Sequence, residues 1–205
     1  MVVTFSRTGF LTLATVLLSL AWRIRRGPHR AWLWGAALLA PLVAFFVLPP
    51  GYLVHLITIT DASSDPTGSA QDRWRDMRLA LGMVTDHPLF GAGLGMDAVA
   101  LNAERSSTWT SVHNVYLQYG ADLGLPGLAL FLALFWSCAN GLRAALRRLR
   151  GDRDRLELLE LTYGLQTSLT GFAVAAFFHP VAYQFPFFYF AGLAVAARGI
   201  ALEET

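Results

Sequence analysis

Lysine is absent from this chain and cysteine occurs only once. The basic residues are therefore all arginine, and they cluster between apolar segments, which is a membrane pattern rather than that of a nucleic-acid binder. The single cysteine, Cys138, excludes an intrachain disulfide and a thiolate metal cluster. Its position inside an apolar run indicates a packing role.

The chain also has too little polar sequence for an ordinary water-soluble domain. Hydrophobic residues make up 55% of its 205 residues, and the mean hydropathy is +0.45. A cleavable signal peptide is not evident, because Arg7 comes too early and no convincing cleavage site follows the first apolar run. The composition predicts an all-α, polytopic membrane protein that spans a lipid bilayer several times.

Five segments come close to the length that crosses a membrane. A bilayer core about 30 Å thick requires roughly 18 to 20 apolar residues in a helix. The predicted spans are residues 5–22, 31–48, 125–142, 161–178 and 181–197, within one membrane domain that covers residues 1–205. Only His179-Pro180 separates the last two, so they form either two spans or a hairpin that does not cross fully.

The arginines of the short loops predict the orientation. One group lies between the first two spans and another between the third and fourth: Arg23, Arg25, Arg26 and Arg30, then Arg143, Arg147, Arg148, Arg150, Arg153 and Arg155. The positive-inside rule places both groups in the cytoplasm. The long loop 49–124, which has more acidic residues than arginines, then lies on the opposite, outer face. The N-terminus would face outward too, which leads us to expect further helices upstream.

The long loop is expected to contain a short amphipathic helix at the membrane surface. Ser69 and Asp72 have the spacing of a capping box, and apolar residues then recur at helical spacing from Trp74 onward. His87-Pro88 ends this helix, and the glycines at 91, 93 and 95 predict a tight turn. The glycine run is a poor nucleotide signature, because no strand precedes it.

Two residues stand out for possible chemistry. Arg7 lies at the mouth of the first span, where its charge is costly, so we favour anion recognition over simple snorkelling to the headgroups. His113 lies where the loop returns to the membrane, and a neutral imidazole there could accept a hydroxyl proton. No second ligand lies at metal-binding spacing from His113, so no metal is expected. On its own, His113 is more typical of an interfacial polar residue than of a catalyst.

Three sequence blocks, taken together, resemble the O-antigen ligase and O-antigen polymerase family. The first is Ser-Arg-Thr-Gly-Phe at 6–10, and the second runs from Arg73 to the Asp-His-Pro-Leu-Phe-Gly-Ala-Gly-Leu-Gly of 86–95. The third is His-Asn-Val-Tyr-Leu-Gln at 113–118, followed by Leu-Gly-Leu-Pro-Gly-Leu at 123–128. The resemblance covers roughly the C-terminal half of a typical member. The tail also resembles members associated with exosortase and exopolysaccharide loci.

The resemblance implies a metal-independent, inverting glycosyltransferase of the bacterial inner membrane with its active site facing the periplasm. Such enzymes pass a glycan from undecaprenyl pyrophosphate to a hydroxyl of lipid A-core, of a growing polysaccharide or of a protein, without a cofactor. Family roles carry over to His113 as catalytic base and to Arg7 and Arg73 as pyrophosphate binders, with Arg75 and Arg78 as substitutes for Arg73. Asn114, beside His113, is expected to bind substrate.

Two other interpretations stay open at this point. A transporter or permease subunit would also be polytopic, but it should place ionisable residues near mid-bilayer on several helices. Here the charges lie at the interface and in the outer loop. An inactive fragment of a ligase is the second alternative, since family members usually have about a dozen spans.

Overall fold

The computed structural model describes residues 7–24, 69–105 and 111–203 of the chain. All regular secondary structure in these residues is helical, which confirms the all-α prediction. The chain divides into two compact units, residues 1–71 and 72–205, and each is described by itself.

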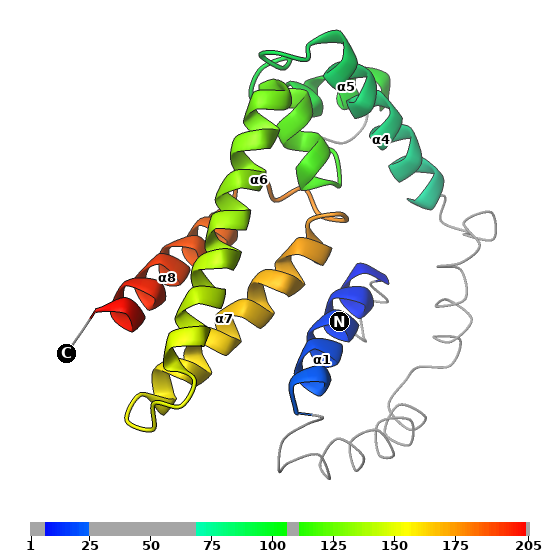
Figure 1. Ribbon diagram of the computed structural model, residues 1–205. Coiled ribbons are helices and arrows are strands. Elements are labelled where there is room, and N and C mark those ends of the chain that lie inside the picture. The colour runs from blue at the N-terminus through cyan, green and yellow to red at the C-terminus, as the bar shows by residue number, and fades with distance from the viewer. Residues whose placement is uncertain (1–6, 25–68, 106–110, 204–205) are drawn as a thin grey trace, which may run out of the picture. The chain divides into compact units, whose positions relative to one another are not determined.

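The first unit contains helix α1, Arg7–Ile24 (Figure 1). Its polar side chains bond to the helix's own backbone: the Thr15 hydroxyl donates to the Leu11 carbonyl at 2.8 Å, and the Ser19 hydroxyl to the Thr15 carbonyl at 2.7 Å. A hydroxyl whose hydrogen bond is made within the helix is less costly in an apolar environment. Helix α1 overlaps the first predicted span, 5–22, whereas the second, 31–48, lies outside the described residues.

Helix α6, Val115–Leu149, is the longest element of the second unit, and it is kinked. Gly124 has a non-helical backbone (φ 71°), and Pro126 follows two residues later. Proline cannot donate the hydrogen bond that would continue the ladder, so a kink is expected at this point. The kink separates an N-terminal arm, residues 115–123, from a longer straight part. The predicted span 125–142 begins at the kink, but the helix continues to Leu149.

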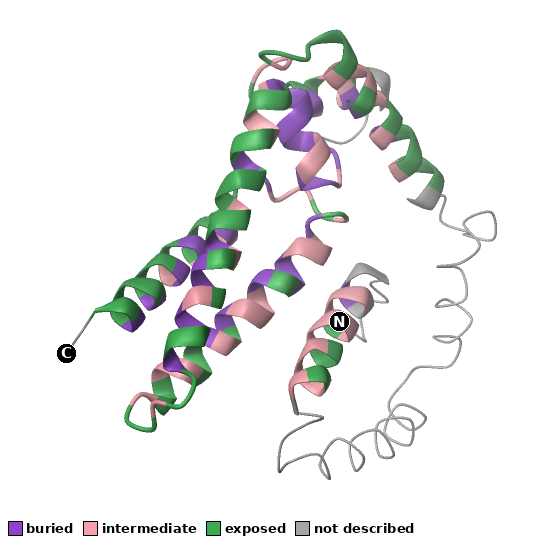
Figure 2. Cartoon of the chain, in the orientation of Figure 1, coloured by how far each residue is buried: buried purple, intermediate pink, exposed green. Residues whose placement is uncertain are grey.

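Helices α7, Leu156–Ala175, and α8, Phe185–Leu202, pack against the straight part of α6 (Figure 1). The buried face of α8 consists largely of alanines, spaced three or four residues apart: Ala191, Ala194, Ala197 and Ala201. Small side chains let helix backbones approach closely, which is a common way of packing helices in membranes. Buried residues accordingly lie on the faces between these helices, and exposed ones on the outer faces (Figure 2).

Aromatic rings fill the core where the kink meets α8. The Phe131 ring stacks on Tyr119 with centroids 4.5 Å apart and meets Phe187 edge-on at 5.0 Å. Phe172 of α7 also stacks on Phe187, at 5.4 Å. Such pairs add to the apolar burial of their large rings. This cluster connects the arm of α6 to α7 and α8.

Two shorter helices pack on the arm of α6. Helix α4 runs Ser69–Asp86, as the sequence predicted, and α5 runs Met96–Arg105, where no helix was predicted. A small apolar core joins them to the arm and to the segment before it: Ala80, Leu101, Val112 and Ala121. The region that the sequence indicated as a long loop is therefore partly a folded platform.

Among the described residues, two helices are long and apolar enough to cross a membrane, α6 and α8. Helices α1 and α7 overlap two further predicted spans. The connection between α7 and α8 runs from 176 to 184, so α8 begins four residues later than the predicted fifth span. The number of five spans remains a prediction.

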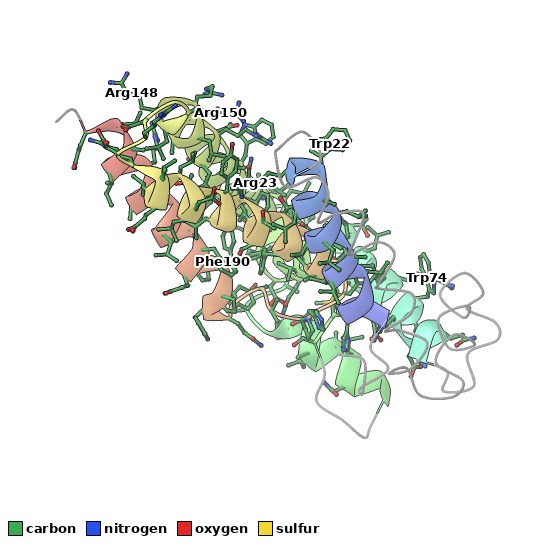
Figure 3. The ribbon with its side chains drawn as sticks, turned by 90° about the horizontal axis from the view of Figure 1, so that it is seen from below. Trp22, Arg23, Trp74, Arg148, Arg150 and Phe190 are labelled. Carbon is green, nitrogen blue, oxygen red and sulfur yellow. The ribbon has the colours of Figure 1, made fainter. Side chains whose placement is uncertain are left out.

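The arginine-rich turn and the platform lie at opposite ends of the second unit. Arg148 and Arg150 project at the end where α6 turns into α7, whereas Trp74 of α4 lies at the other end (Figure 3). Gly151, with φ 97°, makes this turn, and Arg155 pairs with Asp152 at 3.6 Å. A helix that spans a bilayer would therefore hold the two regions on opposite faces.

Candidate functional site

The loop after α4 lies directly against the kink of α6. The Leu125 N–H donates to the Pro88 carbonyl at 2.8 Å, and the Ala92 N–H to the Ala121 carbonyl at 2.8 Å. A Cβ atom at Gly91 would come within 2.3 Å of the Asp122 backbone, so only glycine fits there. Gly91 also has a positive φ of 68°, which favours glycine independently. The predicted turn is confirmed, and its glycines permit close approach to α6.

Asp122 connects three segments at this contact. Its side chain is fully buried, and its Oδ1 accepts from the Asp97 N–H at 3.1 Å. Its Oδ2 accepts from the Gly95 N–H at 3.0 Å and from the Tyr183 hydroxyl at 3.1 Å. The carboxylate thus caps the N-terminus of α5, where backbone N–H groups and the helix dipole favour a negative charge.

Tyr183 brings the connection between α7 and α8 to the same carboxylate. The residue as a whole is 42% exposed, but its hydroxyl end reaches the buried Asp122 side chain. Desolvation around that end, followed by the negative charge of Asp122 and the hydrogen bond to it, raises the pKa of Tyr183. The phenol therefore remains a neutral donor across the physiological range.

Asp97 extends this arrangement to the segment that carries His113. The Asp97 Oδ2 atom accepts from the Val112 N–H at 2.9 Å. Burial raises the pKa of Asp97, the Val112 bond opposes this rise, and the charge of Asp122 adds to it. One buried carboxylate therefore positions α5, and a second, on α5, holds the backbone next to His113.

His113 is half-buried and stands just before α6, in the segment that Asp97 holds. Asn114 is the N-cap of α6: its Oδ1 accepts from the Leu117 N–H at 3.0 Å. An asparagine cap stabilises a helix start by about 1 kcal/mol. Asn114 therefore has a structural role as a helix cap, and its contact with substrate remains a prediction.

The connection between α7 and α8 is bonded to the arm that follows His113. The Val115 N–H donates to the Ala176 carbonyl at 2.8 Å, and the Tyr119 hydroxyl to the Ala182 carbonyl at 2.6 Å. The Gln118 side chain accepts from the Ala182 N–H at 3.3 Å. These bonds hold both ends of the stretch that contains His179.

Arg73 of α4 lies near His179. Desolvation, and then the positive charge of Arg73, lower the pKa of His179, although the residue as a whole is exposed. The charge of Arg73, in the second motif block, therefore acts on the connection that is bonded to the third block. Sequence reasoning treated His179 as a turn residue before a proline and did not find this proximity.

The other predicted arginines differ from Arg73 in burial or in the unit to which they belong. Arg73 is half-buried on α4, whereas Arg75 and Arg78 are exposed. Arg7 is the first residue of α1 and belongs to the other unit, so its approach to His113 remains a prediction.

Among the described residues, no three His, Cys, Asp or Glu side chains gather closely enough to hold a metal ion.

A model of the O-antigen ligase family matches residues 1–132, well over half of the chain. The chain belongs to the O-antigen ligase family. The match includes all three sequence blocks, α4, α5 and the kink of α6, so the resemblance inferred from those blocks is confirmed. No curated protein matches the chain.

Family membership indicates a membrane protein with glycosyltransferase-like activity on lipid-linked glycans. The matched region ends within α6, so α7 and α8 lie beyond it. His179 and Tyr183 therefore enter the site through the structure alone. The likeness of the tail to exosortase-associated members remains a prediction.

Proposed function

We propose that the chain transfers a glycan from undecaprenyl pyrophosphate to an acceptor hydroxyl, without a metal ion and with inversion of the anomeric carbon. The acceptor is lipid A-core, a growing polysaccharide or a protein, and the reaction takes place on the periplasmic face of the inner membrane. The observation that carries the proposal is that Arg73 lies near His179, in the connection bonded to the His113 arm, in a chain of the O-antigen ligase family.

In this mechanism the arginines stabilise the leaving group. The bond between the anomeric carbon and the pyrophosphate oxygen breaks, and negative charge develops on that oxygen. A guanidinium group offers two parallel N–H donors to phosphate oxygens. We assign this role to Arg73 and, as the second pyrophosphate binder, to Arg7. Arg75 takes this role in place of Arg73 if the binder is displaced along α4.

His113 acts on the acceptor. Its neutral imidazole takes the hydroxyl proton while the acceptor oxygen attacks the anomeric carbon from the side opposite the pyrophosphate. Attack from that side inverts the anomer. The carboxylates of Asp122 and Asp97 hold the backbone next to His113, so the base is presented from a fixed segment rather than from a free loop.

Purified variants can separate donor binding from transfer. His113→Ala should bind the undecaprenyl-pyrophosphate-linked glycan normally, while transfer falls by roughly 10²-fold or more, the usual contribution of a general base. Arg73→Lys should instead weaken donor binding, because lysine keeps the charge but loses the planar fork. Binding and single-turnover transfer are measured on the same preparation.

The matched control is His87→Ala, which removes an exposed histidine of the turn after α4 and should leave both quantities unchanged. Loss of donor binding in parallel with transfer in His113→Ala would show that His113 anchors the segment and is not the base. Unchanged transfer in that variant would exclude it from the reaction.

A further inference from the structure

The stretch from residue 88 to the first residue of α5 carries no polar side chain. Residues 88–96 read Pro-Leu-Phe-Gly-Ala-Gly-Leu-Gly-Met. Phe90 is 87% exposed, Leu94 67% and Leu89 65%. Loops in water are ordinarily polar, and three large apolar side chains on one short loop indicate that it contacts something apolar.

Most backbone N–H groups of this loop donate hydrogen bonds within the protein. The N–H groups of Gly91, Ala92 and Gly93 donate to the carbonyls of His87, Ala121 and Asp122. Those of Gly95 and Met96 donate to the Asp122 carboxylate and to the Gly93 carbonyl. Irregular backbone is tolerated at membrane depth only where its polar groups find partners in the protein.

The loop is also continuous with the apolar surface of a candidate span. Leu125, which bonds to the Pro88 carbonyl, is 52% exposed and lies at the kink where the straight part of α6 begins. Leu130 and Trp136 continue the exposed apolar surface along α6. Leu89 and Phe90 therefore extend the surface that α6 presents to lipid.

We propose that the loop 88–96 inserts into the bilayer and acts as a lipid anchor beside the first residues of the α6 span. Because Asp122 and the backbone bonds connect this loop rigidly to α5, the anchor also fixes the height of the His113 segment above the lipid. The inference depends on the membrane position of α6 and is independent of the proposed glycosyl transfer.

The test places an environment-sensitive nitrobenzoxadiazole label on single cysteines in a Cys138→Ala background. Phe90→Cys and Leu94→Cys report on the loop, and Leu130→Cys serves as the lipid-facing reference. Thr85→Cys, on an exposed polar residue at the end of α4, is the matched aqueous control. The protein is reconstituted in vesicles of phosphatidylethanolamine and phosphatidylglycerol.

Insertion predicts that the labels at 90 and 94 emit at shorter wavelength than the label at 85, close to the label at 130. They should be quenched by spin-labelled lipid and protected from aqueous iodide. Two results would each overturn the proposal. One is iodide quenching at 90 and 94 equal to that at 85, which means a loop in water. The other is protection from both quenchers, which means a loop covered by protein, such as a second copy of this chain.

Discussion

Arg73 and Arg75 are two positions apart on α4 but differ in surroundings. Arg73 is half-buried, and its charge reaches His179, whereas Arg75 is exposed. The resemblance alone left both as phosphate binders. Their different surroundings favour Arg73, since a guanidinium that faces another element can meet a ligand held between them.

The link between Arg73 and His179 gives a titration prediction. A neighbouring positive charge disfavours the charged imidazolium, so Arg73→Gln should raise the pKa of His179 back toward its ordinary value. Arg75→Gln should leave it unchanged, because Arg73 is the charged residue that lowers the pKa of His179. Chemical shifts of labelled histidine followed against pH measure both variants. An identical titration in wild type and Arg73→Gln would show that the two side chains do not interact.

Single residues of the site were only partly readable from the sequence. His113 and Arg73 lie in recognisable blocks, so the resemblance found them. Asp97 and Asp122 counted only as acids of an outer loop, although both are buried and hydrogen-bonded. Their partners lie 15 to 27 residues away, apart from Tyr183, which is 61 residues away, and no local pattern reports such distances.

At the scale of elements, the glycine loop depends on two separate properties of its glycines. Gly91 has a positive φ and no room for a Cβ, Gly95 has a positive φ but open space, and Gly82 has open space within α4. A left-handed conformation costs a residue with a Cβ about 1 to 2 kcal/mol. A clash with backbone adds to that cost, because the backbone of Asp122 cannot move aside easily.

Alanine substitutions at these three positions should therefore form a graded series. Gly91→Ala should be the most destabilising, Gly95→Ala should cost about 1 to 2 kcal/mol, and Gly82→Ala should be neutral or stabilising by up to about 1 kcal/mol. Thermal unfolding of the detergent-solubilised proteins gives the order. Equal effects at 91 and 95 would mean that the loop does not pack on α6 at the observed distance.

The helices show why some elements were predictable. Helix α4 has local signals at both ends, which are the capping-box spacing of Ser69 and Asp72 and the His87-Pro88 pair after Asp86. It was predicted with the correct end. Helix α5 starts where Asp122, from another helix, accepts its N–H groups. Because the cap comes from a distant residue, the sequence of α5 by itself gave no start signal.

Helix α6 illustrates the difference between a span and a helix. The hydropathy criterion ended the span at 142, where the arginines begin, but arginine is a good helix former and the helix continues to Leu149. At the other end, Gly124 and Pro126 separate the span from the arm that carries the site. The sequence contains both residues, yet it does not show that the chain is already helical before them, from Val115 onward.

At the scale of the whole molecule, the distribution of arginines and the arrangement of the helices favour the same orientation in the membrane. Arg143, Arg147 and Arg148 are exposed near the end of α6 that turns into α7, and the platform of α4 and α5 lies at the other end (Figures 1 and 3). The site needs access to a lipid-linked donor at the interface, and the platform adjoins the start of the straight part of α6. A fixed orientation in the membrane is therefore part of the function that we propose.

Impermeant maleimide labelling of intact bacterial cells, with the outer membrane opened, tests this orientation. In a Cys138→Ala background, Ala103→Cys on α5 should react from the periplasm. Asp154→Cys, in the arginine-rich turn, should react only after the inner membrane is permeabilised. Both positions are exposed, and neither substitution removes an arginine, so the positive-inside signal that sets the topology is preserved. Labelling of position 154 in intact cells, with position 103 protected, would place His113 in the cytoplasm and exclude a reaction on the periplasmic face.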